Sequence, residues 1–165
     1  TPMRSSAASD VYKRQPVPQF VARPDKMMRF TDAVKNCVRN NYLGFSGRAS
    51  RSEYWWFMLF LQIVPIVGYV LVFAYISVAL GEEGATMSFE TLMNLLTLPS
   101  LVTLAFLLPA LSVSVRRLHD TGKSGWMLLI TLIPCIGLIL WLVWMIEDGQ
   151  AHHNAYGSVP TNLLE

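Results

Sequence analysis

The sequence predicts an all-α, polytopic membrane protein. We expect a bundle of three transmembrane helices, with a fourth possible, and a short N-terminal interfacial amphipathic helix. Of the 165 residues, 53% are hydrophobic and only 15% are charged, whereas an average soluble domain carries about 25% charged residues. No Asp, Glu, Lys or Arg lies within residues 54–81, 91–115 or 124–146. This composition excludes a disordered chain and argues against an ordinary water-soluble enzyme.

The uncharged stretches contain three predicted spans, at about residues 55–80, 95–115 and 126–146. A bilayer core about 30 Å thick needs about 20 apolar residues of helix, so each stretch is long enough to cross. The first would measure about 39 Å as a helix, and it must therefore tilt, kink or protrude. Pro65 offers a kink. A tight hairpin is disfavoured there, because each half would be too short to span.

Lysine and arginine predict how these spans are oriented. Basic residues precede the first span and follow the second, whereas the loop after the first span and the tail after the third contain none. Because basic residues collect on the cytoplasmic side, three spans with the N-terminus inside and the C-terminus outside fit this pattern. Trp55 and Trp126 open the first and third spans, as interfacial aromatic residues do.

The predicted organisation has four parts. Residues 1–27 form a leader without periodicity or an apolar core, which we expect to be non-native or disordered. A cytoplasmic tail over 28–52, a membrane domain over 53–146 and a C-terminal tail over 147–165 follow. The leader holds five of the 13 basic residues and two of the 11 acidic ones, and the rest therefore carries a net charge of −1. The pI near 8.6 is then no indication of nucleic-acid binding.

The cytoplasmic tail contains a short amphipathic pattern. Phe30, Val34, Cys37 and Val38 recur at helical spacing, with charged residues elsewhere around the helix. Such a helix can lie on the inner leaflet or pack against the rest of the protein, and the sequence leaves both open.

The segment GFSGRASRSEYWW is the first motif. Ser50 and Glu53 have the spacing of a capping box directly before an apolar run. Arg48 and Arg51 would lie at the level of the lipid phosphates, with which arginine forms paired hydrogen bonds. A helix start with a topology anchor is the favoured interpretation, and a site for an anionic ligand is the alternative.

The segment SVSVRRLHDTGKSGW is the second motif. Arg116 and Arg117 are placed at a helix C-terminus, where positive charge is favourable, and Asp120 can pair with either. Gly122 can adopt the positive φ of a turn, and Ser124 is a candidate N-cap for the third span.

Neither histidine motif predicts chemistry by itself. His119 precedes Asp120, but catalytic partners meet in space rather than in sequence, so a structural turn is favoured over a general base. The doublet His152–His153 lacks further ligands at metal spacing, whereas zinc needs three or four. We expect no metal and no cofactor.

The motifs GRASRSEYWWF, RRLHDTGKSGW, IPCIG and NAYGSVP occur in this order, and through them the chain resembles domain-of-unknown-function family 805 over about residues 42–160. These are small bacterial inner-membrane proteins. The resemblance implies a helical bundle of three or four spans in that membrane, with a periplasmic C-terminus in our topology, and it implies no reaction. The signature positions that carry over are Gly47, Arg48, Arg51, Glu53, Tyr54, Trp55, Arg116, Arg117, Leu118, His119, Asp120, Ser124, Gly125, Trp126, Asn154, Tyr156, Gly157 and Pro160.

Three functions remain in view. The favoured one is a structural or interaction protein that assembles in the lipid bilayer, with itself as a homo-oligomer or with a membrane protein partner. The second is an oligomeric transporter or pore for small solutes, although the spans lack the midplane charge that ion carriers usually keep. The third is an anionic-lipid-binding module or an enzyme at the inner face. Its candidate headgroup cluster is Arg48, Arg51, Arg116, Arg117, His119 and Asp120.

Overall fold

The computed structural model describes residues 26–81 and 86–160. Within these ranges the regular structure is helical, and the only strand-like feature is an isolated bridge between Asn154 and Gly157. The predicted all-α class is therefore confirmed. Residues 1–25 of the predicted leader and residues 161–165 of the predicted tail lie outside the described ranges.

The first predicted span is one continuous helix, α3 (Arg51–Leu80), with Pro65 inside it. It begins as the capping motif predicts, because Ser50 Oγ accepts a hydrogen bond from the Glu53 amide at 3.2 Å. A hairpin within this stretch is not formed. The helix is long and apolar enough to cross a membrane.

The second predicted span is longer than expected and is divided into α4 (Phe89–Ala105) and α5 (Leu107–Asp120). The break at Phe106 follows from Pro109, which has no amide proton to donate to the carbonyl four residues earlier. That carbonyl, of Ala105, accepts a hydrogen bond from the Tyr42 hydroxyl instead. The stretch Phe89–Asp120 is again long and apolar enough to cross a membrane.

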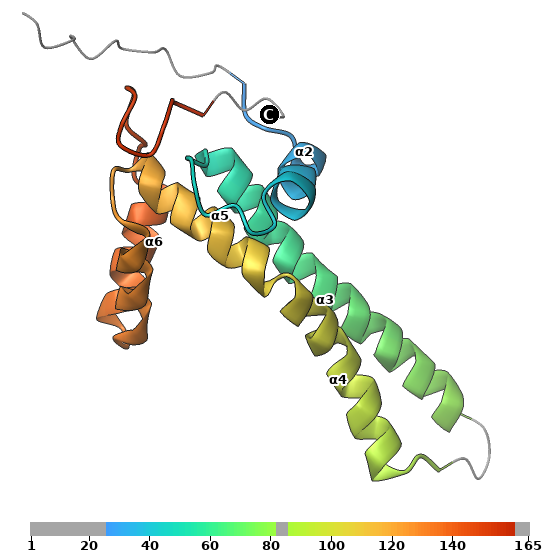
Figure 1. The fold of residues 1–165 in the computed structure, drawn as a ribbon. Helices are drawn as coiled ribbons and strands as arrows, with labels where there is room; N and C mark the ends of the chain where they lie inside the picture. Colours follow the sequence, from blue (N-terminus) through green and yellow to red (C-terminus); the bar gives the residue numbers. More distant parts are fainter. Residues whose placement is uncertain (1–25, 82–85, 161–165) are drawn as a thin grey trace, which may run out of the picture.

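Helices α3 and α4 run side by side as an antiparallel pair (Figure 1). They lie close together at Gly68, where an added Cβ would lie 2.9 Å from the Cβ of Pro99. The Tyr69 and Ser100 hydroxyls are hydrogen-bonded at 2.9 Å across the same interface. A glycine facing a proline thus allows the two helices to approach closely.

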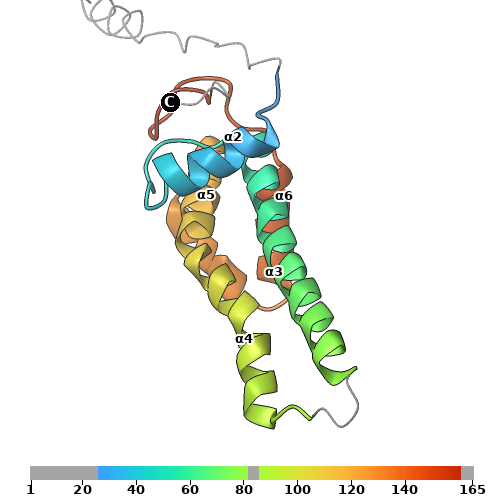
Figure 2. The same cartoon turned by 90° about the vertical axis from the view of Figure 1, so that its right-hand side faces the viewer.

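The third predicted span is not one helix. A 3₁₀-helix, η2 (Gly125–Leu132), leads into a turn, after which α6 (Ile136–Ile146) runs back beside η2 (Figures 1 and 2). Pro134 and the positive φ of Cys135, 62°, interrupt the helix between them. Gly137 packs so closely on the Ile130 carbonyl that a side chain there would collide with it.

We call η2, the turn and α6 the hairpin. It places the C-terminal segment at another end of the molecule than the one predicted. At 1.5 Å per residue α6 is about 16 Å long, roughly half of a 30 Å bilayer core. Both ends of the hairpin lie together, as the 2.5 Å ion pair between Lys123 and Glu147 shows. The expected placement of the two termini on opposite sides required one continuous third helix. Instead, residues 147–160 lie at the same end of the molecule as residues 26–50.

The N-terminal pattern forms α2 (Phe30–Lys35), which continues into a short π-helix, η1 (Asn36–Asn40). This pair packs across the start of α3, where the Phe30 and Trp56 rings meet edge to face with centroids 5.9 Å apart. Ala33 and Cys37 are completely buried. The helix therefore packs against the protein, and its position relative to a membrane surface stays a prediction.

The core lies at this same end. We call residues 26–57, 112–124 and 145–160 the head. Its fully buried apolar side chains include Tyr54, Phe57, Val113, Leu118 and Met145 from α3, α5 and α6, and smaller ones from α2, η1 and the loop before α3. Most apolar side chains of α3, α4 and α6 beyond the head are exposed, as they are when lipid surrounds them.

The hairpin predicts that residues 46 and 153 face the same side of the membrane and residue 86 the other. We expect Ser46→Cys and His153→Cys, each exposed, to react with a membrane-impermeant maleimide from one side only. Thr86→Cys should react from the opposite side. The background carries Cys135→Ser, and Cys37 is buried. Labelling of spheroplasts and inverted vesicles measures this, and reaction of positions 46 and 153 from opposite sides would contradict the hairpin.

Candidate functional site

Three buried arginines from two distant parts of the chain meet in the head. Arg48 lies in the loop before α3, and Arg116 and Arg117 lie in the last turns of α5; their side chains are 1%, 4% and 0% exposed. A charge removed from water must be paired and hydrogen-bonded. Two buried carboxylates, Glu53 and Asp120, supply this pairing. We call these five residues the arginine network.

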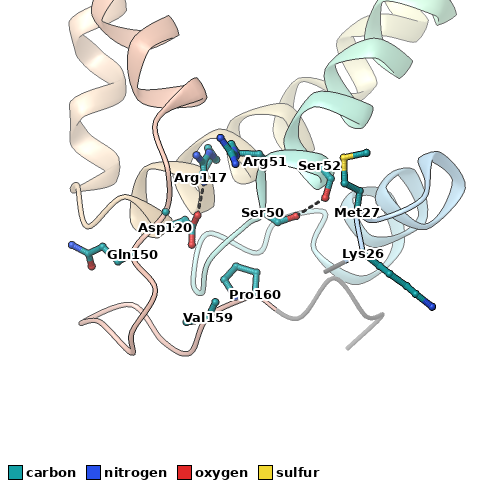
Figure 3. Close-up of a pocket in the computed structure, with 11 residues that line it drawn as sticks. Lys26, Met27, Ser50, Arg51, Ser52, Arg117, Asp120, Gln150, Val159 and Pro160 are labelled. Carbon is teal, nitrogen blue, oxygen red and sulfur yellow. Dashed lines mark hydrogen bonds and ion pairs between the residues drawn. The ribbon is translucent and has the colours of Figure 1, made fainter. Parts of the chain in front are cut away.

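Asp120 joins two of the arginines. Its Oδ1 lies 2.8 Å from Arg48 Nη2 and accepts from Arg48 Nε at 2.9 Å. Its Oδ2 pairs with Arg117, three residues earlier on α5 (Figure 3). The sequence predicted pairing with Arg116 or Arg117, and the structure shows Arg117. It adds Arg48, which is 72 positions away.

Arg116 pairs with Glu53 instead, with 2.8 Å between Nη1 and Oε1. The same Oε1 accepts from Asn36 Nδ2 at 3.1 Å and from the Cys37 thiol at 3.5 Å. Only the serine of the predicted capping box therefore acts as predicted. Ser50 caps the helix, while the Glu53 carboxylate binds the arginine of α5 and the π-helix η1.

The Cys37 thiol is held protonated by this environment. Burial raises its pKa well above that of a free thiol, and the neighbouring Glu53 carboxylate raises it further, although Arg116 opposes this. The neutral thiol therefore acts as a hydrogen-bond donor to Glu53, and not as a nucleophile.

Arg48 and Arg117 also bind the C-terminal segment through its backbone. Arg48 donates to the carbonyls of Gln150, His152 and Gly157. Arg117 donates to those of Met145 and Glu147. Because each guanidinium has five N–H donors in a fixed fork, a single side chain can hold several carbonyls together with a carboxylate. These two arginines therefore fasten residues 145–157 onto the head.

His119 takes part in a separate set of contacts. Its ring stacks on Tyr156 with centroids 3.8 Å apart and planes at 3°, and its Nδ1 lies 3.2 Å from the Gly47 carbonyl. Asn154 Nδ2 donates to the His119 carbonyl at 2.9 Å, and Asn154 Oδ1 accepts from the Tyr156 amide at 2.9 Å. His119 therefore packs on Tyr156 and contacts backbone groups, and it does not pair with Asp120, which binds the arginines.

The other signature positions shape the head or its edge. Gly122 has a φ of 77° in the turn after α5, as predicted, and Ser124 Oγ accepts from the Trp126 amide at 3.4 Å. An added Cβ at Gly125 would lie 2.7 Å from a methyl group of Val115. Trp55, Trp126 and Pro160 lie at the surface or edge of the head. Arg51 is half exposed and pairs with Asp148 at 2.8 Å.

The head contains two cavities beside the network. One, of about 180 Å³, lies between the start of α3 and the C-terminal segment, with Arg51, Arg117, Asp120 and Pro160 among its lining residues (Figure 3). The other, of about 290 Å³, lies on the side of η1 and Arg116. In the described ranges, no group of three or more His, Cys, Asp or Glu side chains could hold a metal ion.

We expect Asp120→Asn to destabilise the protein strongly, because it leaves Arg48 and Arg117 buried without their carboxylate. Breaking such a pair costs about 3–5 kcal/mol of the free energy of unfolding. The matched control is Asp148→Asn at the exposed pair with Arg51, where at most about 1 kcal/mol is expected. Denaturant unfolding in detergent micelles measures both, and equal effects of the two variants would contradict the buried network.

The raised pKa of Cys37 predicts an unreactive thiol. In a Cys135→Ser background we expect no modification by maleimide at pH 8 in the folded protein, and full modification in denaturant, because the native thiol is buried and protonated. Mass spectrometry of the reaction products measures this. Rapid modification of the folded protein would show that the contact with Glu53 and Arg116 is not formed.

Comparison with known proteins indicates a membrane protein. A family model described as "Protein of unknown function (DUF805)" matches residues 42–158. The chain is 41% identical over 123 residues to inner membrane protein YhaI of Escherichia coli (strain K12), covering 74% of this chain and 91% of that protein. It is 36% identical over 123 residues to inner membrane protein YhaH of the same strain, covering 74% and 92%. No solved structure matches it.

The matched region contains both motifs of the arginine network and the described segment that this network fastens. Together with the two helical stretches suited to cross a membrane, these relatives show a small integral membrane protein. The chain belongs to the DUF805 family.

Proposed function

We propose that this chain is a structural or interaction protein of the bacterial inner membrane, which assembles with a second copy or with another membrane protein. One observation carries this proposal. Three of the buried charges that a catalytic or transport site would need, those of Arg48, Arg117 and Asp120, are bound within the chain, where they hold the C-terminal segment onto the head.

The membrane segments support the same conclusion. Their uncharged stretches, 54–81, 91–115 and 124–146, offer no Asp, Glu, Lys or Arg to couple ion movement. Two of the polar side chains that a water path through the spans would need bind their own helices. Thr103 donates to the Pro99 carbonyl at 2.9 Å, and Thr131 donates to the Leu128 carbonyl at 2.8 Å. No contact in the described chain favours the transporter or pore.

The hairpin also supports a topology of two crossings with a cytoplasmic head. Arg48, Arg51, Arg116, Arg117 and Lys123 all belong to the head or its edge, and basic residues mark the cytoplasmic side. In this topology η2 and α6 enter the bilayer and return, and residues 147–160 are cytoplasmic. The apolar faces of α4 and α6 then face lipid or a partner helix.

One observation favours a second candidate function, an anionic-lipid-binding module. A groove of about 510 Å³ runs along the start of α3, lined by Arg51, Trp55, Trp56, Leu59 and Ile146 among others. Arg51 is half exposed at this groove. A lipid phosphate beside Arg51, with its chain along the tryptophans and Leu59, fits these residues.

Native mass spectrometry of the full chain released from nanodiscs tests both candidates. The nanodiscs contain phosphatidylcholine and phosphatidylglycerol, and photo-crosslinking residues at Leu101 and Leu138 probe the exposed faces of α4 and α6 in native membranes. For the assembly function we expect a defined oligomer or a protein adduct at one of these faces. A control crosslinker at His153, in the head, should give no protein adduct.

A monomer in the nanodisc, together with adducts to lipid alone at both helix faces, would contradict the assembly function. For the second candidate, we expect retained phosphatidylglycerol that is lost in Arg51→Gln and kept in Arg39→Gln. Arg39 is an exposed arginine of η1 and does not line the groove. Equal retention in both variants would exclude Arg51 as the headgroup ligand.

A further inference from the structure

The cavity of about 290 Å³ in the head is polar and lies beside a buried charge. It is bounded by η1, the loop before α3 and residues 157–160. Three asparagines and two serines line it together with Arg48, Glu53 and Arg116. A single water needs only about 10–15 Å³ of such space, so the cavity has room for a small molecule.

Arg116 lines this cavity, and its guanidinium group has few partners within the described chain. Its side chain is 4% exposed, and its Nη1 pairs with Glu53 at 2.8 Å. Its Nη2 has the Cys37 sulfur at 3.9 Å. Its buried Nε finds no hydrogen-bond partner within residues 26–81 and 86–160. The guanidinium charge of Arg116 is therefore held by one carboxylate and few hydrogen bonds, and a buried charge is stabilised by additional pairing.

The arginine network also has an unbalanced charge. It contains three buried guanidinium groups, of Arg48, Arg116 and Arg117, and two buried carboxylates, of Glu53 and Asp120. One positive charge is therefore in excess. The C-terminus of α5 contributes a partial negative charge, but the N-terminus of α3, at Glu53, contributes a partial positive one. Backbone carbonyls supply dipoles but no net charge. A bound anion would balance the network.

We propose that this cavity binds a small oxyanion, a carboxylate or phosphate group, which pairs with the guanidinium group of Arg116 at the cavity wall. Arg116 is the recognition group, because the Arg48 donors are directed to Asp120 and to three backbone carbonyls. The asparagine amides and serine hydroxyls of the lining suit the remaining oxygens of such a group. This site goes beyond the proposed assembly function, since it needs no partner protein.

The test uses the full chain in nanodiscs of phosphatidylcholine, titrated with inorganic phosphate or acetate. We expect a saturable rise in Tm of at least about 2 °C. Arg116→Gln should weaken the apparent affinity at least about tenfold, because it removes a charge-assisted hydrogen bond. The matched control Arg39→Gln has the same charge change at an exposed residue of η1 that does not line the cavity, and it should keep the response.

A second variant covers the case in which Arg116→Gln does not fold. Ser46→Phe places a ring at an exposed serine of the cavity lining. It removes no charge of the network, and we expect it to abolish the phosphate response without lowering the Tm measured in the absence of anion. A third arm uses nanodiscs of phosphatidylglycerol without added anion. Retained lipid that Ser46→Phe releases would identify the oxyanion as a headgroup phosphate.

Two results would overturn the proposal. One is a Tm response of the same size in the wild type, Ser46→Phe and Arg39→Gln, which would indicate a general salt effect. The other is the absence of any response to phosphate or acetate, together with no lipid retention that depends on the cavity. Because the assembly experiment measures oligomers and adducts at α4 and α6, its outcome is independent of this one.

Discussion

The carboxylate of Asp120 is the constraint on which the head depends. It meets Arg48 from the loop before α3 and Arg117 from α5, and both arginines continue to the backbone of the C-terminal segment. Three parts of the chain that are far apart in sequence therefore meet at one buried group. The side chains involved are almost fully removed from water, so neither arginine can lose its partner without leaving an uncompensated charge. The RRLHD motif at the end of α5 therefore contributes three of the five charged side chains of the network.

Much of the fold could be predicted from the sequence because it depends on local rules. The absence of charge over residues 54–81 predicts a long membrane helix, and Ser50 predicts where it begins. The positive φ of Gly122 and the cap at Ser124 follow equally from residue type and spacing. The candidate headgroup cluster combined residues of the two arginine motifs, and the structure brings Arg48, Arg116, Arg117 and Asp120 together in the head.

The hairpin and the carbonyl contacts could not be predicted in the same way. Residues 126–146 are apolar and long enough for a span, and neither length nor composition shows that the chain turns back at Pro134 and Cys135. Likewise, Arg48 and Arg117 bind backbone oxygens of residues 145–157. Every residue offers such an oxygen, so the sequence holds no signal for which ones are used.

The large sequence separation between Arg48 and its carbonyl partners has a consequence for the order of folding during synthesis. The carbonyls of His152 and Gly157 are 104 and 109 residues beyond it, and contacts so distant in sequence form late. The pair of α3 and α4 can enter the membrane while the ribosome is still translating, because its contacts are local by comparison. The contacts of the head cannot all form until residues 150–157 have been synthesised. A chain that stops before residue 150 therefore keeps the pair between Arg48 and Asp120 but lacks the three backbone carbonyls that complete the contacts of Arg48.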